Sequence, residues 1–220
     1  MAQPKLRIGI IGAGYIASWH ADALKASDHV ELVAICDVSL ATAQGLAAGY
    51  GVTAFGALED MIAAEICDAV HILTPPHLHK DLALQCIAAG LHVLVEKPVA
   101  ESAEDTLQIH QAAEAAGVRF HAGHNFLGLP AYQRLKQARD LGRIGRVSAL
   151  EIHWNLPLAP LRSGPYGIWL LQQARNLLLE LGPHPFSFAV DLLGPLTITH
   201  LELSQPITLP GGAVRHQGWR

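Results

Sequence analysis

The sequence predicts an α/β fold built on a doubly wound parallel sheet, followed by a smaller α+β region. Short apolar runs alternate with helix-length segments from Leu6 to Ala122 of the 220-residue chain. These runs are apolar along their length, so both of their faces must be buried, as in a parallel sheet covered by crossover helices. A glycine-rich turn directly after the first run supports the same fold class.

The predicted elements of the sheet follow one another as βα units. The strands are expected at Leu6–Ile11, Val30–Cys36, Ala69–Leu73, His92–Val95 and Val118–Ala122. The helices are expected at Tyr15–Ala26, Ser39–Ala48, Gly56–Ala64, Pro76–Ala89 and Ser102–Ala116. Ser39 is a suitable N-cap, and Gly90 and Gly117 follow helix ends, where a left-handed residue is favoured.

Beyond Ala122 the rhythm changes, which predicts a second domain over residues 124–220 after a first domain over residues 1–123. Its expected helices cover Leu129–Leu141 and Trp169–Leu193, and its expected strands cover Arg146–Trp154 and Leu196–Leu203. Loops are expected at Asn155–Gly167 and, as a loop or frayed tail, at Pro206–Arg220. Two strands make a marginal sheet, so the domain is expected to be truncated: either the chain is a fragment, or it is a shortened protein whose exposed sheet edge pairs with another subunit.

Charge and composition exclude several classes of protein. The formal net charge is −4 and the basic residues are scattered, so the sequence has no basic patch that would bind nucleic acid or an anionic membrane. No apolar segment approaches the ~20 residues of a membrane helix, and Met1–Lys5 carries no apolar signal region. Cys36, Cys67 and Cys86 lack metal-ligand spacing, so we expect buried free thiols and a cytoplasmic protein.

The turn from Gly12 to Ala17 has the G-x-G-x-x-A form of a Rossmann dinucleotide-binding site. Gly12 permits a tight turn, Gly14 lets a pyrophosphate approach the backbone, and Ala17 allows close packing of helix on strand. Tyr15 and Ile16 begin the expected helix, and the free N–H groups of its first turn would hold the pyrophosphate. An ordinary turn between strand and helix is the alternative interpretation.

Asp37 ends the second predicted strand about 20 residues after this turn, where a carboxylate binds the ribose hydroxyls of NAD. The following residues, Val38–Leu40, include no arginine or lysine that would accept the 2′-phosphate of NADP. The sequence therefore favours NAD over NADP. A solvated aspartate in a turn is the alternative.

The Glu96-Lys97-Pro98 turn follows another predicted strand, at the carboxyl edge where open α/β sheets bind ligands. A lysine desolvated there beside a nicotinamide would exchange a proton with a substrate hydroxyl. Pro98 favours an extended conformation at Lys97. Chemistry alone leaves open a surface Glu–Lys pair without a catalytic role.

An ordered set of segments resembles the glucose–fructose oxidoreductase / inositol dehydrogenase (Gfo/Idh/MocA) family. The segments are GIIGAGYIA, CDVS, ILTPPHLH, VEKPVA, HNFLGLPAYQRLK and LGRIGRV, over about Lys5–Val147. The resemblance implies that Lys97 lies beside the nicotinamide and the substrate. It also implies a set of cofactor-binding candidates: Thr74 and Pro75 of a covering loop, His79, Glu96 and Asn125.

Some positions depart from the family pattern or leave alternatives open. An arginine is frequent two residues after Asn125, where this chain has Leu127, so one polar contact is expected to be missing. His77 and His79 have no third ligand nearby, so no metal is expected. His79 is expected to be a helix-start residue rather than a catalyst.

Glu180 and His184 resemble the carboxylate and histidine that the family carries four residues apart on a helix of its second domain. Residues at this spacing share a helix face, so Glu180 would orient His184, and His184 would polarise the substrate oxygen. Pro183 interrupts this helix. The alternative for His184 is a buried polar group packed among Phe186 and Phe188.

The resemblance implies an NAD(P)-dependent oxidoreductase that transfers hydride between the nicotinamide and a sugar, sugar derivative or cyclic polyol. Two alternatives remain open: a cofactor-retaining enzyme that cleaves its substrate after transient oxidation, and a non-catalytic NAD-binding regulatory protein. Family members are longer than this chain, and their second domain commonly forms dimer interfaces. We therefore expect a homodimer or homotetramer assembled through the second domain.

Overall fold

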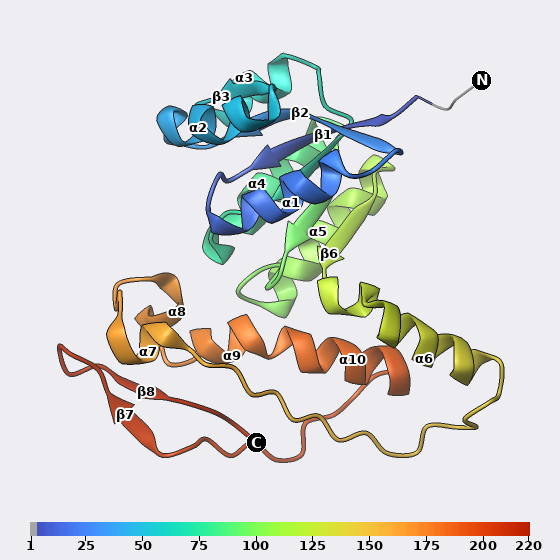
Figure 1. The fold of residues 1–220 in the computed structure, drawn as a ribbon, viewed down its shortest axis with the longest axis vertical. Coiled ribbons are helices and arrows are strands. Elements are labelled where there is room, and N and C mark those ends of the chain that lie inside the picture. The colour runs from blue at the N-terminus through green and yellow to red at the C-terminus, as the bar shows by residue number, and fades with distance from the viewer. Residues whose placement is uncertain (1–3) are drawn as a thin grey trace. The chain divides into compact units, whose positions relative to one another are not determined.

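The computed structural model describes residues 4–220, so part of Met1–Lys5, the segment expected to lack a signal region, lies outside the described residues. The chain divides into two compact units (Figure 1). Unit 1 runs to Gly123, and unit 2 comprises residues from His124 to Arg220. No helix among the described residues is both long enough and apolar enough to cross a bilayer.

Unit 1 contains a six-stranded parallel sheet of Rossmann type with the order β3-β2-β1-β4-β5-β6, which confirms the predicted fold class. Its strands are β1 (Leu6–Ile11), β2 (Val30–Cys36), β3 (Thr53–Phe55), β4 (Ala69–Ile72), β5 (His92–Glu96) and β6 (Phe120–Gly123). Sequence reasoning missed β3, which is only three residues long. The strand order reverses between β1 and β4, and ligands bind at such a switch point.

Helices cover both faces of this sheet. They are α1 (Tyr15–Lys25), α2 (Leu40–Tyr50), α3 (Leu58–Ala63), α4 (Pro76–Ala88) and α5 (Ala103–Ala116). Buried residues of α1 and α2 pack in one cluster, and those of α3, α4 and α5 pack in the other. Ser39 caps α2 by accepting a hydrogen bond from the Thr42 N–H, and Gly90 and Gly117 have φ values of +80° and +67°, as predicted.

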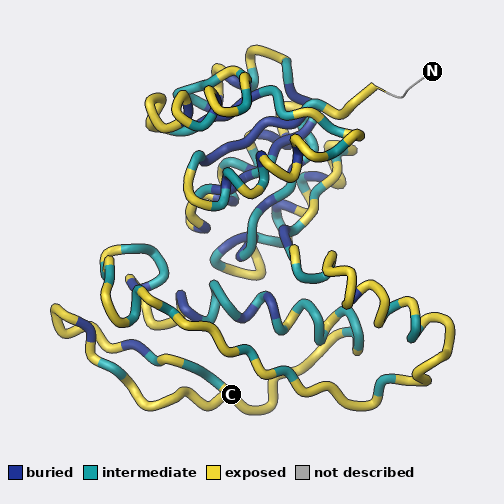
Figure 2. The backbone as a smooth tube through the Cα atoms, in the orientation of Figure 1, coloured by how far each residue is buried: buried dark blue, intermediate teal, exposed yellow. Residues whose placement is uncertain are grey.

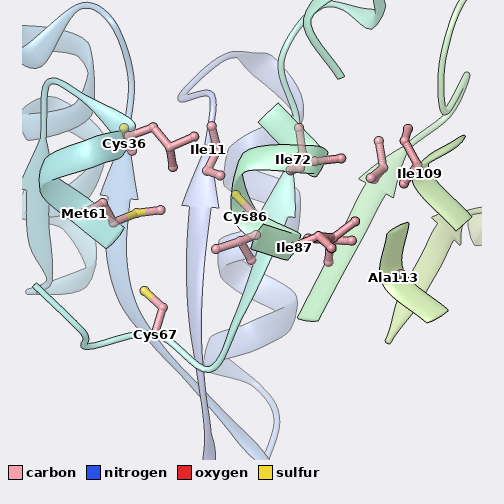
Figure 3. Packing of buried hydrophobic residues seen from close by; sticks show 14 of the residues in the cluster. Ile11, Cys36, Met61, Cys67, Ile72, Cys86, Ile87, Ile109 and Ala113 are labelled. Atoms are coloured by element: carbon pink, nitrogen blue, oxygen red, sulfur yellow. The ribbon is translucent and has the colours of Figure 1, made fainter. Parts of the chain in front are cut away.

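The cluster under α3, α4 and α5 is built from aliphatic side chains and three thiols (Figure 3). Ile11 and Ile72 of the sheet face Met61 of α3 and Ile87 of α4 in this layer. All three cysteines are free and buried, as expected. Burial raises the pKa of the Cys36 and Cys67 thiols to about 11 and that of Cys86 to about 12.

Unit 2 is formed by short helices and one β-hairpin. They are η1 (Asn125–Gly128), α6 (Pro130–Asp140), α7 (Ala159–Ser163), α8 (Trp169–Gln172), α9 (Asn176–Leu181), α10 (Pro183–Leu193), β7 (Pro206–Thr208) and β8 (Val214–His216). The helix predicted over Leu129–Leu141 corresponds to α6. The loop predicted over Asn155–Gly167 contains the one-turn helix α7, so that expectation was incomplete.

The strand predictions for unit 2 were wrong. Residues 146–154 form no strand in the described chain, because no other segment pairs with their backbone. In Leu196–Leu203 only Leu203 makes a β-bridge, to Trp219. The predicted tail instead forms the antiparallel β7–β8 hairpin, whose turn contains Gly211 and Gly212 with φ values of +92° and +86°.

The single helix predicted over Trp169–Leu193 is divided into α8, α9 and α10. Gly182 joins α9 to α10 with helical dihedral angles and donates its N–H to the Leu178 carbonyl at 2.7 Å. Pro183 has no N–H to continue this pattern, so one helix ends and the next begins here. An added Cβ at residue 182 would lie 2.6 Å from the Leu178 oxygen, which requires glycine at the join.

Candidate cofactor and catalytic site

The glycine turn after β1 has the geometry that its sequence predicts. Gly12 has a φ of +97° and donates its N–H to the Cys36 carbonyl at 2.8 Å. An added Cβ on Gly12 would lie 3.0 Å from Leu73 and Thr74, so two loops approach too closely for any side chain. An added Cβ on Gly14 would meet nothing within 4 Å, which leaves open space before α1.

The amino end of α1 is available to an anion. No side chain caps it, and its N-cap is Gly14. Ala17 is completely buried, in accord with close packing of α1 on the sheet, and Tyr15 is exposed. Free N–H groups at a helix start, together with the helix dipole, attract phosphate groups.

Asp37 is fixed beside this turn by two backbone hydrogen bonds. Its Oδ2 accepts from the Ala13 N–H at 2.8 Å, and its Oδ1 accepts from the Ser39 N–H at 2.9 Å. The next residue, Val38, is 98% exposed. A carboxylate has about four lone-pair sites, so Asp37 can accept further hydrogen bonds from hydroxyl groups.

Thr74 lies after β4, on the other side of the switch point. Its Oγ1 is buried and has no hydrogen-bond partner within the described part of the chain. Pro75 follows at the surface and precedes α4. A buried hydroxyl without a partner is costly, and a polar ligand atom would satisfy it.

His79 connects two loops at the carboxyl edge of the sheet. The ring is 1% exposed, with Nδ1 2.9 Å from the Pro98 carbonyl oxygen and Nε2 2.6 Å from the Thr74 carbonyl oxygen. Burial lowers the pKa of His79, although both carbonyls act to raise it. Its position suits support of the two loops better than direct contact with a ligand.

The Glu96-Lys97-Pro98 turn lies at the carboxyl end of β5. Glu96 Oε2 accepts a hydrogen bond from the Lys97 N–H at 3.0 Å, and the Lys97–Pro98 peptide bond is cis. The Glu96 side chain is 13% exposed and Lys97 is half-buried, so they do not form a solvated surface pair. An added Cβ at Gly123 would lie 3.0 Å from Glu96 Oε1, so β6 also confines this carboxylate.

Two histidines that sequence reasoning did not single out connect to Glu96, His20 directly and His71 through His20. His20 of α1 lies with Nε2 3.3 Å from Glu96 Oε1 and with Nδ1 3.0 Å from Nδ1 of His71 on β4. A histidine inside the otherwise apolar strand Ala69–Ile72 was the available signal, since a buried imidazole requires a polar partner.

In unit 2, His184 lies in an aromatic environment. It is 7% exposed, stacks on Trp154 with ring centroids 5.4 Å apart, and meets the ring of Phe126 edge-on at 4.6 Å. His184 is therefore buried, as the alternative interpretation states, and the rings that it contacts include Trp154 and Phe126; Phe186 is 40% exposed, and Phe188 pairs with Tyr132 and Trp154.

The remaining predicted site residues of unit 2 are distributed over three helices. Glu180 lies half-buried on α9, whereas His184 lies on α10, beyond the Gly182 join. Asn125 begins η1 and is exposed. No group of three or more His, Cys, Asp or Glu side chains among residues 4–220 could hold a metal ion.

Comparisons with known proteins agree with this geometry. Residues 6–124 match the family model of Gfo/Idh/MocA, described as an oxidoreductase family with an NAD-binding Rossmann fold. An uncharacterized oxidoreductase of Synechocystis is 30% identical over 93% of this chain and 56% of its own length. An inositol 2-dehydrogenase of Rhizobium meliloti is 31% identical over 88% of this chain and 57% of its own length.

A structural comparison supports the fold. An oxidoreductase from Agrobacterium radiobacter, solved with NAD+, L-tartaric acid and magnesium, superposes with a TM-score of 0.80. It is 21% identical, and the match covers 98% of this chain and 62% of that protein. The chain thus spans little more than half the length of the two curated relatives.

Proposed function

This chain belongs to the Gfo/Idh/MocA family of oxidoreductases, and we propose from this membership that it acts as an NAD(P)-dependent dehydrogenase of a sugar, sugar derivative or cyclic polyol. One observation carries the proposal: the glycine turn, the Asp37 carboxylate and the unpartnered Thr74 hydroxyl meet at the switch point of the sheet. The similarity to an inositol 2-dehydrogenase supports a polyol-like substrate.

The residues at the switch point fit a dinucleotide. The open backbone at Gly14 and the N–H groups at Tyr15 and Ile16 would hold the pyrophosphate. Asp37 would accept the ribose hydroxyls, and with the uncharged Val38 beside it this favours NAD over NADP. Thr74 would donate its hydroxyl to the cofactor.

The chemistry of the proposed reaction divides between a proton and a hydride. NAD, when bound, supplies the hydride acceptor. We assign to Lys97 the role of the general base that takes the proton of the substrate hydroxyl. For His184 we propose, from the family resemblance alone, a hydrogen bond to a substrate oxygen. Glu180 would orient His184, and His79 supports the two loops that contain Thr74 and Pro98. Pro75 and Asn125 are proposed as cofactor contacts from the family resemblance.

The proposal is tested by assaying a panel of sugars and cyclic polyols at saturating NAD. The expected result is formation of NADH with at least one polyol or sugar and its loss in the Lys97→Met variant. Turnover with NAD returned unchanged would indicate the cofactor-retaining alternative. NAD binding without product from any substrate would contradict the dehydrogenase assignment.

We also propose a homodimer or homotetramer that forms through unit 2, in a cytoplasmic protein. Ile198, Leu201 and Leu203 are exposed on the segment that leads into the hairpin. These exposed apolar side chains support a surface that a second copy of the chain covers. Three buried free thiols support a reducing compartment. Light scattering after size-exclusion chromatography would give the oligomeric state, and a monomer at all concentrations would contradict self-association.

A further inference from the structure

A chain of buried hydrogen bonds runs from the interior of unit 1 to the backbone of Lys97. His71 Nδ1 lies 3.0 Å from His20 Nδ1, and His20 Nε2 lies 3.3 Å from Glu96 Oε1. The other Glu96 oxygen, Oε2, accepts the Lys97 N–H at 3.0 Å. The side chains of His20 and Glu96 are only 18% and 13% exposed, so little water competes for these bonds.

Strand register explains why these groups meet. His71 pairs with Leu94 in the β4–β5 ladder, and Glu96 lies two residues beyond Leu94, on the same face of the sheet. This face is the one covered by α1, which supplies His20. The hydrogen bonds therefore connect α1, β4 and β5 beside the turn that carries Lys97.

The direction of the chain follows from what each group can donate. A carboxylate only accepts, so His20 must donate from Nε2 to Glu96. A neutral His20 then has a bare Nδ1, which requires Nδ1–H on His71. Burial, together with the charge that His20 carries when protonated, lowers the pKa of His71 to about 4, so His71 is neutral at pH 7.

The charge of Glu96 is consistent with this direction. Burial acts to raise the pKa of its carboxyl, but the hydrogen bond from His20, the charge of His20 when protonated, and a contribution from Lys97 outweigh burial and lower it. Glu96 is therefore an ionised acceptor for both His20 and the Lys97 N–H.

We propose that His71 and His20 are positioning residues, which fix the orientation of Glu96 and, through its second oxygen, the turn that carries Lys97. A rotated Glu96 would release the Lys97 N–H and leave the turn without this anchor. An effect on catalysis rests on the proposed function of Lys97. The positioning of Glu96 by His20 and His71 is independent of that function.

The first test reads the protons directly. In the protein labelled with ¹⁵N-histidine at pH 8, NMR should show His71 as the Nδ1–H tautomer and His20 as the Nε2–H tautomer. Free histidine favours Nε2–H, so the expected state of His71 differs from the default. The variants His71→Leu and His20→Gln assign the signals. An Nε2–H tautomer on His71 would contradict the deduced hydrogen bonds and overturn the proposal.

The second test follows the Lys97 amide by hydrogen exchange. His20→Leu should speed its exchange about fivefold, the effect of losing one net hydrogen bond. The N–H of Val93 in β5, which donates to the Arg119 carbonyl just before β6 at 2.8 Å, should remain protected. His20→Gln keeps one donor and one acceptor and should restore slow exchange at Lys97.

A matched control and kinetics complete the design. His110 of α5 is an exposed histidine whose Nε2 lies 3.6 Å from the Glu114 carboxylate, and His110→Leu should change nothing. His20→Leu should lower kcat about tenfold, through misplacement of the base, with the Kd for NAD within about twofold. Unchanged Lys97 exchange in His20→Leu would overturn the proposal. If the parent has no turnover, the tautomers and exchange rates still decide it, while the proposed function alone fails.

Discussion

The two units of the chain are stabilised in different ways. Unit 1 buries two layers of aliphatic side chains against its sheet, and Ile10, Ile35 and Val70 are completely buried. Figure 2 shows that long buried stretches of backbone are concentrated in this unit. In unit 2 few side chains are buried. Four of them are polar or aromatic, namely Tyr132, Asn176, His184 and Arg215, and the others are Leu171, Leu177 and Leu209.

Polar ties take the place of a large core in unit 2. Tyr132 donates its hydroxyl to Asp191 Oδ2 at 2.6 Å, and Lys136 pairs with the same carboxylate at 2.9 Å, which joins α6 to α10. Arg215 of β8 donates to the carbonyl oxygens of Leu171 and Gln172 and so joins the hairpin to α8. The proposed cofactor residues thus lie on a rigid scaffold, whereas His184 depends on specific polar and aromatic contacts.

The largest expected effect is on catalysis and comes from replacing Lys97 of unit 1. Lys97→Met removes the proposed general base without touching the glycine turn or Asp37. The expected loss in kcat is about 10³-fold, within the range for a general base, with the Kd for NAD nearly unchanged. Steady-state kinetics and calorimetric titration measure the two quantities, and full activity in the variant would remove Lys97 from the mechanism.

A core truncation should affect unit 1 most. Ile72 is completely buried between the sheet and α4, so Ile72→Ala should lower the free energy of unfolding of unit 1 by about 3 kcal/mol. Hydrogen exchange, read separately for β1, β4 and α10, measures this. An equal loss of protection in α10 would contradict the distinction between the two units.

Acid should destabilise unit 1 through His71. Its pKa is about 4 in the folded protein and near 6.5 when unfolded, so the unfolded state binds more protons between these values. Stability should therefore fall as the pH decreases from about 6.5 towards 4, by up to about 3 kcal/mol. His71→Leu should remove this part of the pH dependence in urea titrations at pH 7 and 5, and an unchanged difference would refute the buried neutral histidine.

The smallest expected effect tests the polar ties of unit 2. Tyr132→Phe removes the hydroxyl from Asp191 and should destabilise unit 2 by about 1 kcal/mol. Tyr50 of α2 donates a similar bond to Asp22 Oδ1 at 2.8 Å, but this bond is exposed to solvent, so Tyr50→Phe should have a smaller effect. A larger effect for Tyr50→Phe, measured by urea denaturation, would reverse this ranking.

Sequence reasoning performed differently in the two units for physical reasons. The bounds of β1 and β2 were predicted to the residue because strands buried on both faces are mostly apolar, and the charged Arg7 and Glu31 lie near their less buried amino ends. In unit 2 the segment 146–154 has alternating exposure near its end but no strand beside it, and a pairing partner cannot be read from local pattern. The hairpin after Pro206 was missed because its strands are only three residues long.

The candidate site shows the same division. Gly12, Gly14 and Asp37 could be predicted because turn geometry and ribose binding require those residue types at that spacing. His20 and His71 could not, since their roles depend on the packing of α1 on the sheet, which brings His20 to His71, 51 residues away, and to Glu96 of β5. The aromatic neighbours of His184 likewise come from segments remote in sequence.

The central claim is that unit 1 binds NAD at the switch point of its sheet, and calorimetric titration of the protein with NAD and NADP tests it most directly. Tight binding of NAD, weaker binding of NADP because of Asp37, and loss of both in Gly14→Val are the predicted results. No binding of either dinucleotide, or tighter binding of NADP than of NAD, would contradict the account.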